Sequence, residues 1–184
     1  GGMLMTNDGD LFDQIGEATA PLVIANHHLA RIPALAPTFL EWKACGSAYA
    51  DAIIANAKAL AGALEARGLP IVGAEHGYTE SHTVIPVVDA YGTGAEVAER
   101  LEACHIIAGG TGVPDEYGSH GLRIGVQEVT RYGMDEDDAD AIAGCIVDAM
   151  AGESSVKERA IELANRFKTV RFTIDAEANG GERL

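Results

Sequence analysis

The feature that most constrains the fold is a long helical pattern over residues 38–67. Small and apolar residues recur there at the three- and four-residue spacing of a single helix face. They are Ile53, Ile54, Ala57, Leu60, Ala61 and Leu64. Gly68 comes shortly after this series and Pro70 follows it, an order typical of a helix end. The pattern therefore predicts one long helix, against which the rest of the chain must pack.

Shorter elements are predicted on both sides of this helix. Helical patterns cover residues 10–18, 93–105, 135–152 and 154–167, and strand patterns cover 3–7, 71–74, 82–89, 106–110 and 122–126. Between residues 21 and 37, the prolines argue against one straight helix. This order of elements favours an α+β fold, in which helices cover a small, mostly antiparallel sheet.

The composition excludes several classes of function. The formal net charge is −15 and no run of Lys and Arg appears, which argues against binding to nucleic acid. No apolar stretch reaches the roughly 18 residues of a membrane span, and the first residues lack the regions of a secretory signal. Cys45, Cys104 and Cys145 are odd in number and far apart, so a reduced, cytoplasmic protein without disulfides is expected.

One arginine interrupts an otherwise apolar strand pattern. Arg123 lies inside the alternation of residues 122–126, and in a strand it shares one face with Gly121 and Gly125. Two glycines on that face predict open space around the guanidinium. Two interpretations follow: a solvated arginine on an edge strand, or a planar pair of donors that binds a carboxylate.

Two adjacent histidines form a second conspicuous polar feature. His27 and His28 follow an apolar run at a loop-to-helix junction, where imidazoles and backbone N–H groups can bind an anion. An ordinary polar helix start is the alternative. No further ligand stands at a metal-binding spacing, so no metal site is predicted. The glycine-rich run 109–112 lacks the lysine of a phosphate-binding loop and predicts a tight turn.

Three stretches of the chain share motifs with one enzyme family. The stretch HGLRIGVQEVTRYGM (120–134) is similar to S-G-I-R-I-G-T-x-x-x-T-T-R-G-M, and residues 49–89 are similar to a segment that begins Y-x-x-x-V-x-x-N-A. The opening GGMLMTND (1–8) matches a G-G-L-I-L-T/x-N-D strand. These are motifs of the serine hydroxymethyltransferases, pyridoxal 5'-phosphate (PLP) enzymes of fold type I. The chain resembles the C-terminal part of such an enzyme, up to about residue 168.

The resemblance also implies a division of the chain and a set of site residues. Residues 1–37 correspond to a remnant of the large domain and residues 38–172 to the connecting helix and small α+β domain. Apart from the resemblance, residues 173–184 are expected to form a flexible tail. Arg123 is implied to bind the α-carboxylate of a small amino-acid substrate. In the family's G-G-P-H loop, Asn26 and His27 replace the second glycine and the proline, and His28 keeps the histidine. All three are implied to contact PLP, with His28 as the residue that could transfer a proton.

The resemblance further implies that this chain needs a partner. The family's Schiff-base lysine precedes the glycine pair with which this sequence begins, and Lys43, Lys58, Lys157 and Lys168 match no such motif. We therefore expect a split enzyme, in which a lysine-bearing N-terminal chain of the same family joins this one in a hetero-oligomer and shares PLP with it. A longer polypeptide that was cleaved or truncated at this point is the alternative.

The expected activity is the making or breaking of the Cα–Cβ bond of a β-hydroxy-α-amino acid. The family's V-N-K-N-x-x-P stretch, whose last asparagine helps to hold folate, is replaced here by IIAGGTGVP (106–114). That change favours a folate-independent aldolase or transaldolase. A fragment of a folate-dependent serine hydroxymethyltransferase and a non-catalytic stabilising partner of a PLP enzyme are the alternatives.

Overall fold

The computed structural model describes residues 3–20, 23–24, 29–153 and 155–174. Contacts divide the chain into two units, Gly1–Leu40 and Glu41–Leu184.

The first unit holds helix α1 (Gly9–Thr19) and the beginning of helix α2 (Arg31–Glu65). Asp8 begins α1, since its carboxylate accepts a hydrogen bond from the backbone N–H of Leu11 at 3.0 Å. The predicted helix 10–18 is thus confirmed. The predicted strand over residues 3–7 is wrong: these residues form no strand, because the described chain offers them no neighbouring strand to pair with.

The long predicted helix is present but begins earlier than its pattern indicates. Helix α2 starts at Arg31 rather than at residue 38, and it runs through Pro37. Pro33 lies in the first turn, where a missing N–H costs nothing, and Pro37 removes one hydrogen bond from a segment rich in alanine and leucine. The helix ends as expected, with Gly68 in the left-handed conformation at φ +86°.

A three-stranded antiparallel sheet lies at the centre of the second unit. Its order is β1 (Thr83–Val84), β3 (His120–Gly125), β2 (Gly109–Gly112), so β3 is the middle strand. The predicted strand 71–74 is reduced to one bridge between Ile71 and Pro86. The predicted strand 82–89 is reduced to β1 and two bridges, in keeping with the proline inside it.

The glycine run 109–112 was predicted as a tight turn, and that prediction is wrong, because these residues form β2. Their lack of side chains serves packing instead. A Cβ on Gly110 would lie 2.6 Å from the carbonyl carbon of Gly94, and a Cβ on Gly94 would lie 2.6 Å from the carbonyl oxygen of Gly121. The glycines therefore let the start of helix α3 (Gly94–Ala103) approach the sheet closely.

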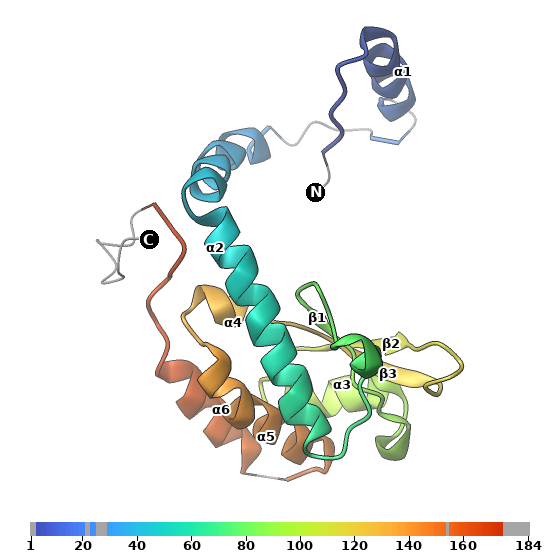
Figure 1. Ribbon diagram of the computed structural model, residues 1–184, viewed down its shortest axis with the longest axis vertical. Coiled ribbons are helices and arrows are strands. Elements are labelled where there is room, and N and C mark those ends of the chain that lie inside the picture. The colour runs from blue at the N-terminus through green and yellow to red at the C-terminus, as the bar shows by residue number, and fades with distance from the viewer. Residues whose placement is uncertain (1–2, 21–22, 25–28, 154, 175–184) are drawn as a thin grey trace. The chain divides into compact units, whose positions relative to one another are not determined.

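Helices cover one face of this sheet, as predicted for an α+β fold. Helix α3 packs on β2 and β3, and helix α5 (Ala139–Met150) packs on α3 and on α6 (Val156–Asn165), as Figure 1 shows. Short turns complete the unit: the one-turn helix α4 (Gln127–Arg131) and the 3₁₀ turns η1 (Ala74–His76), η2 (Asp89–Tyr91) and η3 (Glu136–Asp138). None of the described helices is both long and apolar enough to cross a membrane.

One hydrophobic core joins these elements. It contains Leu60 and Leu64 of α2, Leu122 and Ile124 of β3, and Ile146 of α5, all buried. The predicted helical face of residues 53–64 is therefore the face that meets the core. Because Leu122 and Ile124 are both buried, the side chain of Arg123 between them lies on the opposite face of the sheet.

Candidate substrate site

Arg123 lies in the middle strand of the sheet, on the face that the helices leave open. It pairs across the ladder with Gly109 of β2, and its side chain is exposed while Leu122 and Ile124 are buried. The interpretation of an edge-strand arginine therefore does not apply. The backbone of a central strand is held by hydrogen bonds on both sides and is therefore rigid. A rigid backbone suits a residue that must hold a ligand in one orientation.

The predicted open space around Arg123 comes from a different glycine than expected. A Cβ on Gly121 would lie 2.6 Å from Val113, and a Cβ on Gly125 would lie 2.5 Å from the side-chain oxygen of Gln127, so neighbouring side chains occupy both positions. Gly109, opposite the arginine, would meet only the Nη2 of Arg123, at 3.9 Å. The guanidinium therefore lies over Gly109, and a larger residue there would crowd it.

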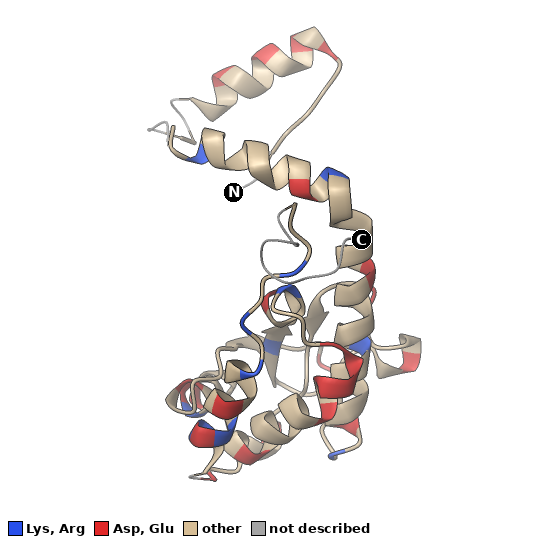
Figure 2. Ribbon diagram, turned by 90° about the vertical axis from the view of Figure 1, so that its left-hand side faces the viewer, with Lys and Arg blue, Asp and Glu red and all other residues tan. Residues whose placement is uncertain are grey.

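The charge environment of Arg123 differs from that of three other arginines. Arg67, Arg131 and Arg159 each reach a carboxylate within 2.8 Å, at Asp140, Glu41 and Asp148 respectively. Over the described residues, Arg123 forms neither an ion pair nor a side-chain hydrogen bond. Acidic residues far outnumber basic ones, and Figure 2 shows them spread over most helices. An arginine left unpaired in such a chain has its donors available for an external anion.

The other predicted site residues are those expected to contact PLP. Asn26, His27 and His28 lie outside the described residues, so their predicted contacts with PLP stay predictions. Lys58 is paired with Glu80 at 2.5 Å. In the described part of the chain, no three His, Cys, Asp or Glu side chains gather as a metal ion requires.

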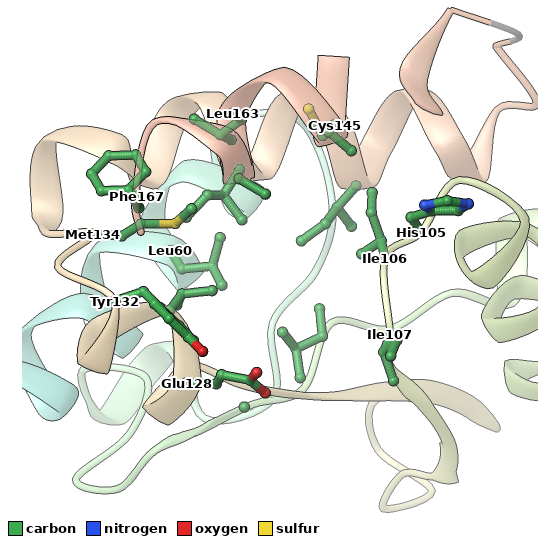
Figure 3. Close-up of a pocket in the computed structure, with 17 residues that line it drawn as sticks. Leu60, His105, Ile106, Ile107, Glu128, Tyr132, Met134, Cys145, Leu163 and Phe167 are labelled. Carbon is green, nitrogen blue, oxygen red and sulfur yellow. The ribbon is translucent and has the colours of Figure 1, made fainter. Parts of the chain in front are cut away.

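The structure also contains a pocket that the sequence did not indicate. It measures about 490 Å³ and is lined mainly by apolar side chains of α2, α4, α5 and α6, with His105, Glu128 and Tyr132 as its polar members (Figure 3). Ile124 lines it, so it lies on the core side of β3, whereas Arg123 points to the other face. Its members come from separate elements and share no local pattern, which is why spacing could not reveal it.

The chain has the fold of part of a fold type I PLP enzyme. A crystal structure of L-threonine transaldolase from Pseudomonas fluorescens matches it with a TM-score of 0.83 and 28% sequence identity. The match covers 94% of this chain and 40% of that one. The similarity therefore extends over both the sheet that carries Arg123 and the long helix α2.

The sequence identifies the family within that class. The serine hydroxymethyltransferase family matches residues 7–146, and the chain belongs to this family. Serine hydroxymethyltransferases of Saccharolobus islandicus and Sulfolobus acidocaldarius are 37% and 39% identical over 95% and 94% of this chain, and that of Methanopyrus kandleri is 40% identical over 89%. The resemblance predicted from the motifs is confirmed. The chain spans about two fifths of the length of these relatives, 40–42%.

Proposed function

We propose that this chain supplies the substrate-carboxylate site of a PLP-dependent enzyme that makes or breaks the Cα–Cβ bond of a β-hydroxy-α-amino acid. The observation that carries the proposal is Arg123, exposed on a central strand with no acidic partner among the described residues. Membership of the serine hydroxymethyltransferase family and the similarity to a threonine transaldolase support the reaction class.

Arg123 would act by holding the substrate in one orientation. Its planar guanidinium offers two parallel N–H donors to the two oxygens of the α-carboxylate, and the neighbouring Gly109 leaves room for them. Fixing the carboxylate limits how the bonds at Cα can turn, which favours cleavage of one of them. When bound, PLP supplies the electron sink for the charge that develops at Cα.

The described residues fit the substrate end of such a site better than the cofactor end. Asn26, His27 and His28 are the proposed contacts for PLP, and His28 the proposed acceptor of the β-hydroxyl proton, since imidazole titrates near neutral pH. We propose that the cofactor lysine comes from a lysine-bearing, serine hydroxymethyltransferase-like partner chain in a cytoplasmic hetero-oligomer. The three free cysteines are consistent with a reduced compartment.

The proposed partner is tested by locating the PLP-modified lysine. We expect the purified chain alone to bind no PLP that borohydride can fix to a single lysine. In the complex isolated from the native host, mass spectrometry should find phosphopyridoxyl-lysine on another polypeptide. Stoichiometric labelling of Lys43, Lys58, Lys157 or Lys168, or of a peptide continuous with this sequence, would contradict the two-chain arrangement.

The proposed role of Arg123 is tested by substitution within that complex. Arg123→Ala should weaken binding of small amino acids by on the order of 3 kcal/mol, over a hundredfold, because a charge-assisted bidentate contact is lost. Arg123→Lys should be nearly as poor, since an ammonium group cannot present two parallel donors. Spectrophotometric titration with glycine and serine gives the affinities. Unchanged affinities in both variants would favour the non-catalytic stabilising partner.

We further propose that the reaction does not require folate. Residues 106–114 stand where the family has its asparagine-bearing stretch, and residues 108–112 among them offer no side chain longer than Thr111. An unpaired buried polar atom of a pterin costs roughly 1–3 kcal/mol. We expect cleavage of threonine, serine and α-methylserine at rates that tetrahydrofolate does not change. A large folate-dependent acceleration confined to serine would instead support a folate-dependent serine hydroxymethyltransferase, the activity for which the curated relatives are named.

A further inference from the structure

Exposed apolar side chains are concentrated at one end of the sequence. The described residues include seventeen exposed large apolar side chains, of which twelve lie between residues 3 and 40: Met3, Leu4, Met5, Leu11, Phe12, Val23, Ile24, Leu29, Ile32, Leu35, Phe39 and Leu40. Helix α1 buries none of its residues. Scattered exposed apolar residues are ordinary, but a dense group of them marks an interaction surface.

Part of this group forms an ordered stripe on helix α2. Ile32, Leu35 and Phe39 follow the i, i+3, i+7 spacing that places side chains on one face of a helix. Leu40 is as exposed as Phe39, at 56% against 51%, but lies about 100° further round the helix. Residues 32–40 include no charged residue. The apolar stripe thus has the form of a helix face that inserts into a groove.

We propose that the apolar stripe, Ile32, Leu35 and Phe39, docks into an apolar groove on the lysine-bearing chain of the same enzyme. This inference rests on the proposed function, because it names where that partner binds. The chain spans about two fifths of its relatives' length, so more than half of a complete enzyme of this family lies in sequence that this chain does not contain. That portion is the surface available to cover the stripe.

The distribution of charge favours such a partner over a second copy of this chain. Residues 1–40 contain four acids, Asp8, Asp10, Asp13 and Glu17, and one basic residue, Arg31. The whole chain carries −15, so two copies meeting through this segment would bring like charges together. Like-charge contacts suppress such pairing, whereas a partner with basic residues around its groove would be attracted.

The test compares single substitutions in the complex of full-length chains. The partner is first identified by its phosphopyridoxyl-lysine, and the dissociation constant is then measured by titrating it into tagged variants of this chain. Phe39→Asp and Leu35→Asp should each weaken binding at least about thirtyfold, the loss expected for an interface anchor. Leu40→Asp, with an equally exposed side chain on the same helix, should change it less than about threefold. Unfolding midpoints should match the wild type, since these residues touch no core.

A reporter next to the stripe gives a second measurement. Trp42, the single tryptophan, lies three residues after Phe39 on α2 and is 60% exposed. With 5-fluorotryptophan incorporated into this chain alone, its single fluorine resonance should shift on binding of the partner.

Stripe variants that bind like wild type, with no shift, would overturn the docking site and leave the proposed function standing. Self-association that Phe39→Asp abolishes in sedimentation experiments would make a second copy the occupant. If no lysine-bearing chain is found at all, the two-chain arrangement itself is wrong, and the docking site falls with it.

Discussion

The described residues between 3 and 40 expose most of their large apolar side chains, whereas residues 41–174 bury most of theirs. In the second region, leucines and valines from α2, α3, β3 and α5 bury one another, and every buried residue of the described chain lies at or beyond Cys45. In the first region, similar side chains are exposed to solvent. The amphipathic α1 carries Asp10, Asp13 and Glu17 along one side and apolar residues along the other, yet buries nothing.

Helical amphipathicity therefore predicts which face of a helix is apolar, but it does not specify which surface covers that face. Residues 41–174 supply their own sheet and helices as the covering surface, so the chain can stabilise that region alone. Residues 3–40 supply one short helix and the start of another, too little to remove their apolar area from water. Four predictions sharpen this contrast, in order of decreasing effect on stability.

The largest effect is expected from a core position. Leu122 of β3 is fully buried, so Leu122→Ala removes two methyl groups and a methine group and leaves a cavity. We expect it to lower the free energy of unfolding by about 3 kcal/mol in urea titrations of the isolated chain. Phe12→Ala, which removes a larger but exposed side chain from α1, should change it by less than about 0.5 kcal/mol. A comparable loss in both variants would show that the first region has a core of its own.

A buried amide should give the next largest effect. Asn56 of α2 donates hydrogen bonds to the Thr130 hydroxyl at 2.9 Å and to the Met134 carbonyl at 3.0 Å, which tie α2 to α4 and to the turn after it. Asn56→Ala leaves the carbonyl without this donor and should cost about 1–3 kcal/mol. Asn7→Ala in the exposed first region is the matched control and should be neutral. Chemical denaturation of both variants checks the prediction.

Equivalent helix caps in the two regions should differ in their consequences. Thr93 and Glu96 form a capping box at the start of α3, and Asp8 caps α1. Thr93→Ala should lower the free energy of unfolding by about 1 kcal/mol, because α3 packs on the sheet. Asp8→Ala should accelerate amide hydrogen exchange within α1 and leave the global unfolding midpoint unchanged. Equal shifts of the midpoint would contradict the division into two regions.

The smallest effect is expected at Glu41, where the second region begins. Its carboxylate accepts hydrogen bonds from Thr173 at 2.6 Å and from Arg131 at 2.8 Å, and these bonds lower its pKa below the usual value. Thr173, the first residue of the predicted flexible tail, is thus tied to α2. Because the folded pKa is depressed, the stabilisation is present above about pH 4.3 and is lost as the pH falls through the folded pKa. Glu41→Gln should cost about 1 kcal/mol or less at pH 7.

The pH dependence provides the check on that variant. The difference in unfolding free energy between wild type and Glu41→Gln should shrink as the pH falls from 6 towards 3, because protonation removes the same charge that the substitution removes. A difference that stays constant over this range would show that the carboxylate charge contributes nothing to the contact.

Much of the architecture and the family could be predicted from local pattern and motif. The one-face spacing of residues 53–64 predicted the core side of α2, and the motif around Arg123 predicted the family that the comparisons confirm. Both signals depend on residues that stand close together in the chain. Such signals can be recognised without knowledge of the tertiary structure, because helical periodicity and strand alternation are properties of the backbone itself.

The features that spacing missed arise where distant segments meet. Residues 109–112 form a strand rather than a tight turn because β3 lies beside them and pairs with them. Gly94 also lies so close to Gly110 that neither position has room for a Cβ. The space beside Arg123 comes from Gly109 rather than from its neighbours in sequence, because Val113 and Gln127 fill the expected gaps.

By itself, then, the sequence determined the helices, the antiparallel α+β architecture and the family, since each follows from short-range periodicity or motif. Only the tertiary structure decided that Arg123 stands on a central strand without an acidic partner in the described chain, and that residues 3–40 lack a core. The physical reason is that exposure and pairing are set by what packs against a residue across the fold, and the residue's own neighbours in the chain do not specify that.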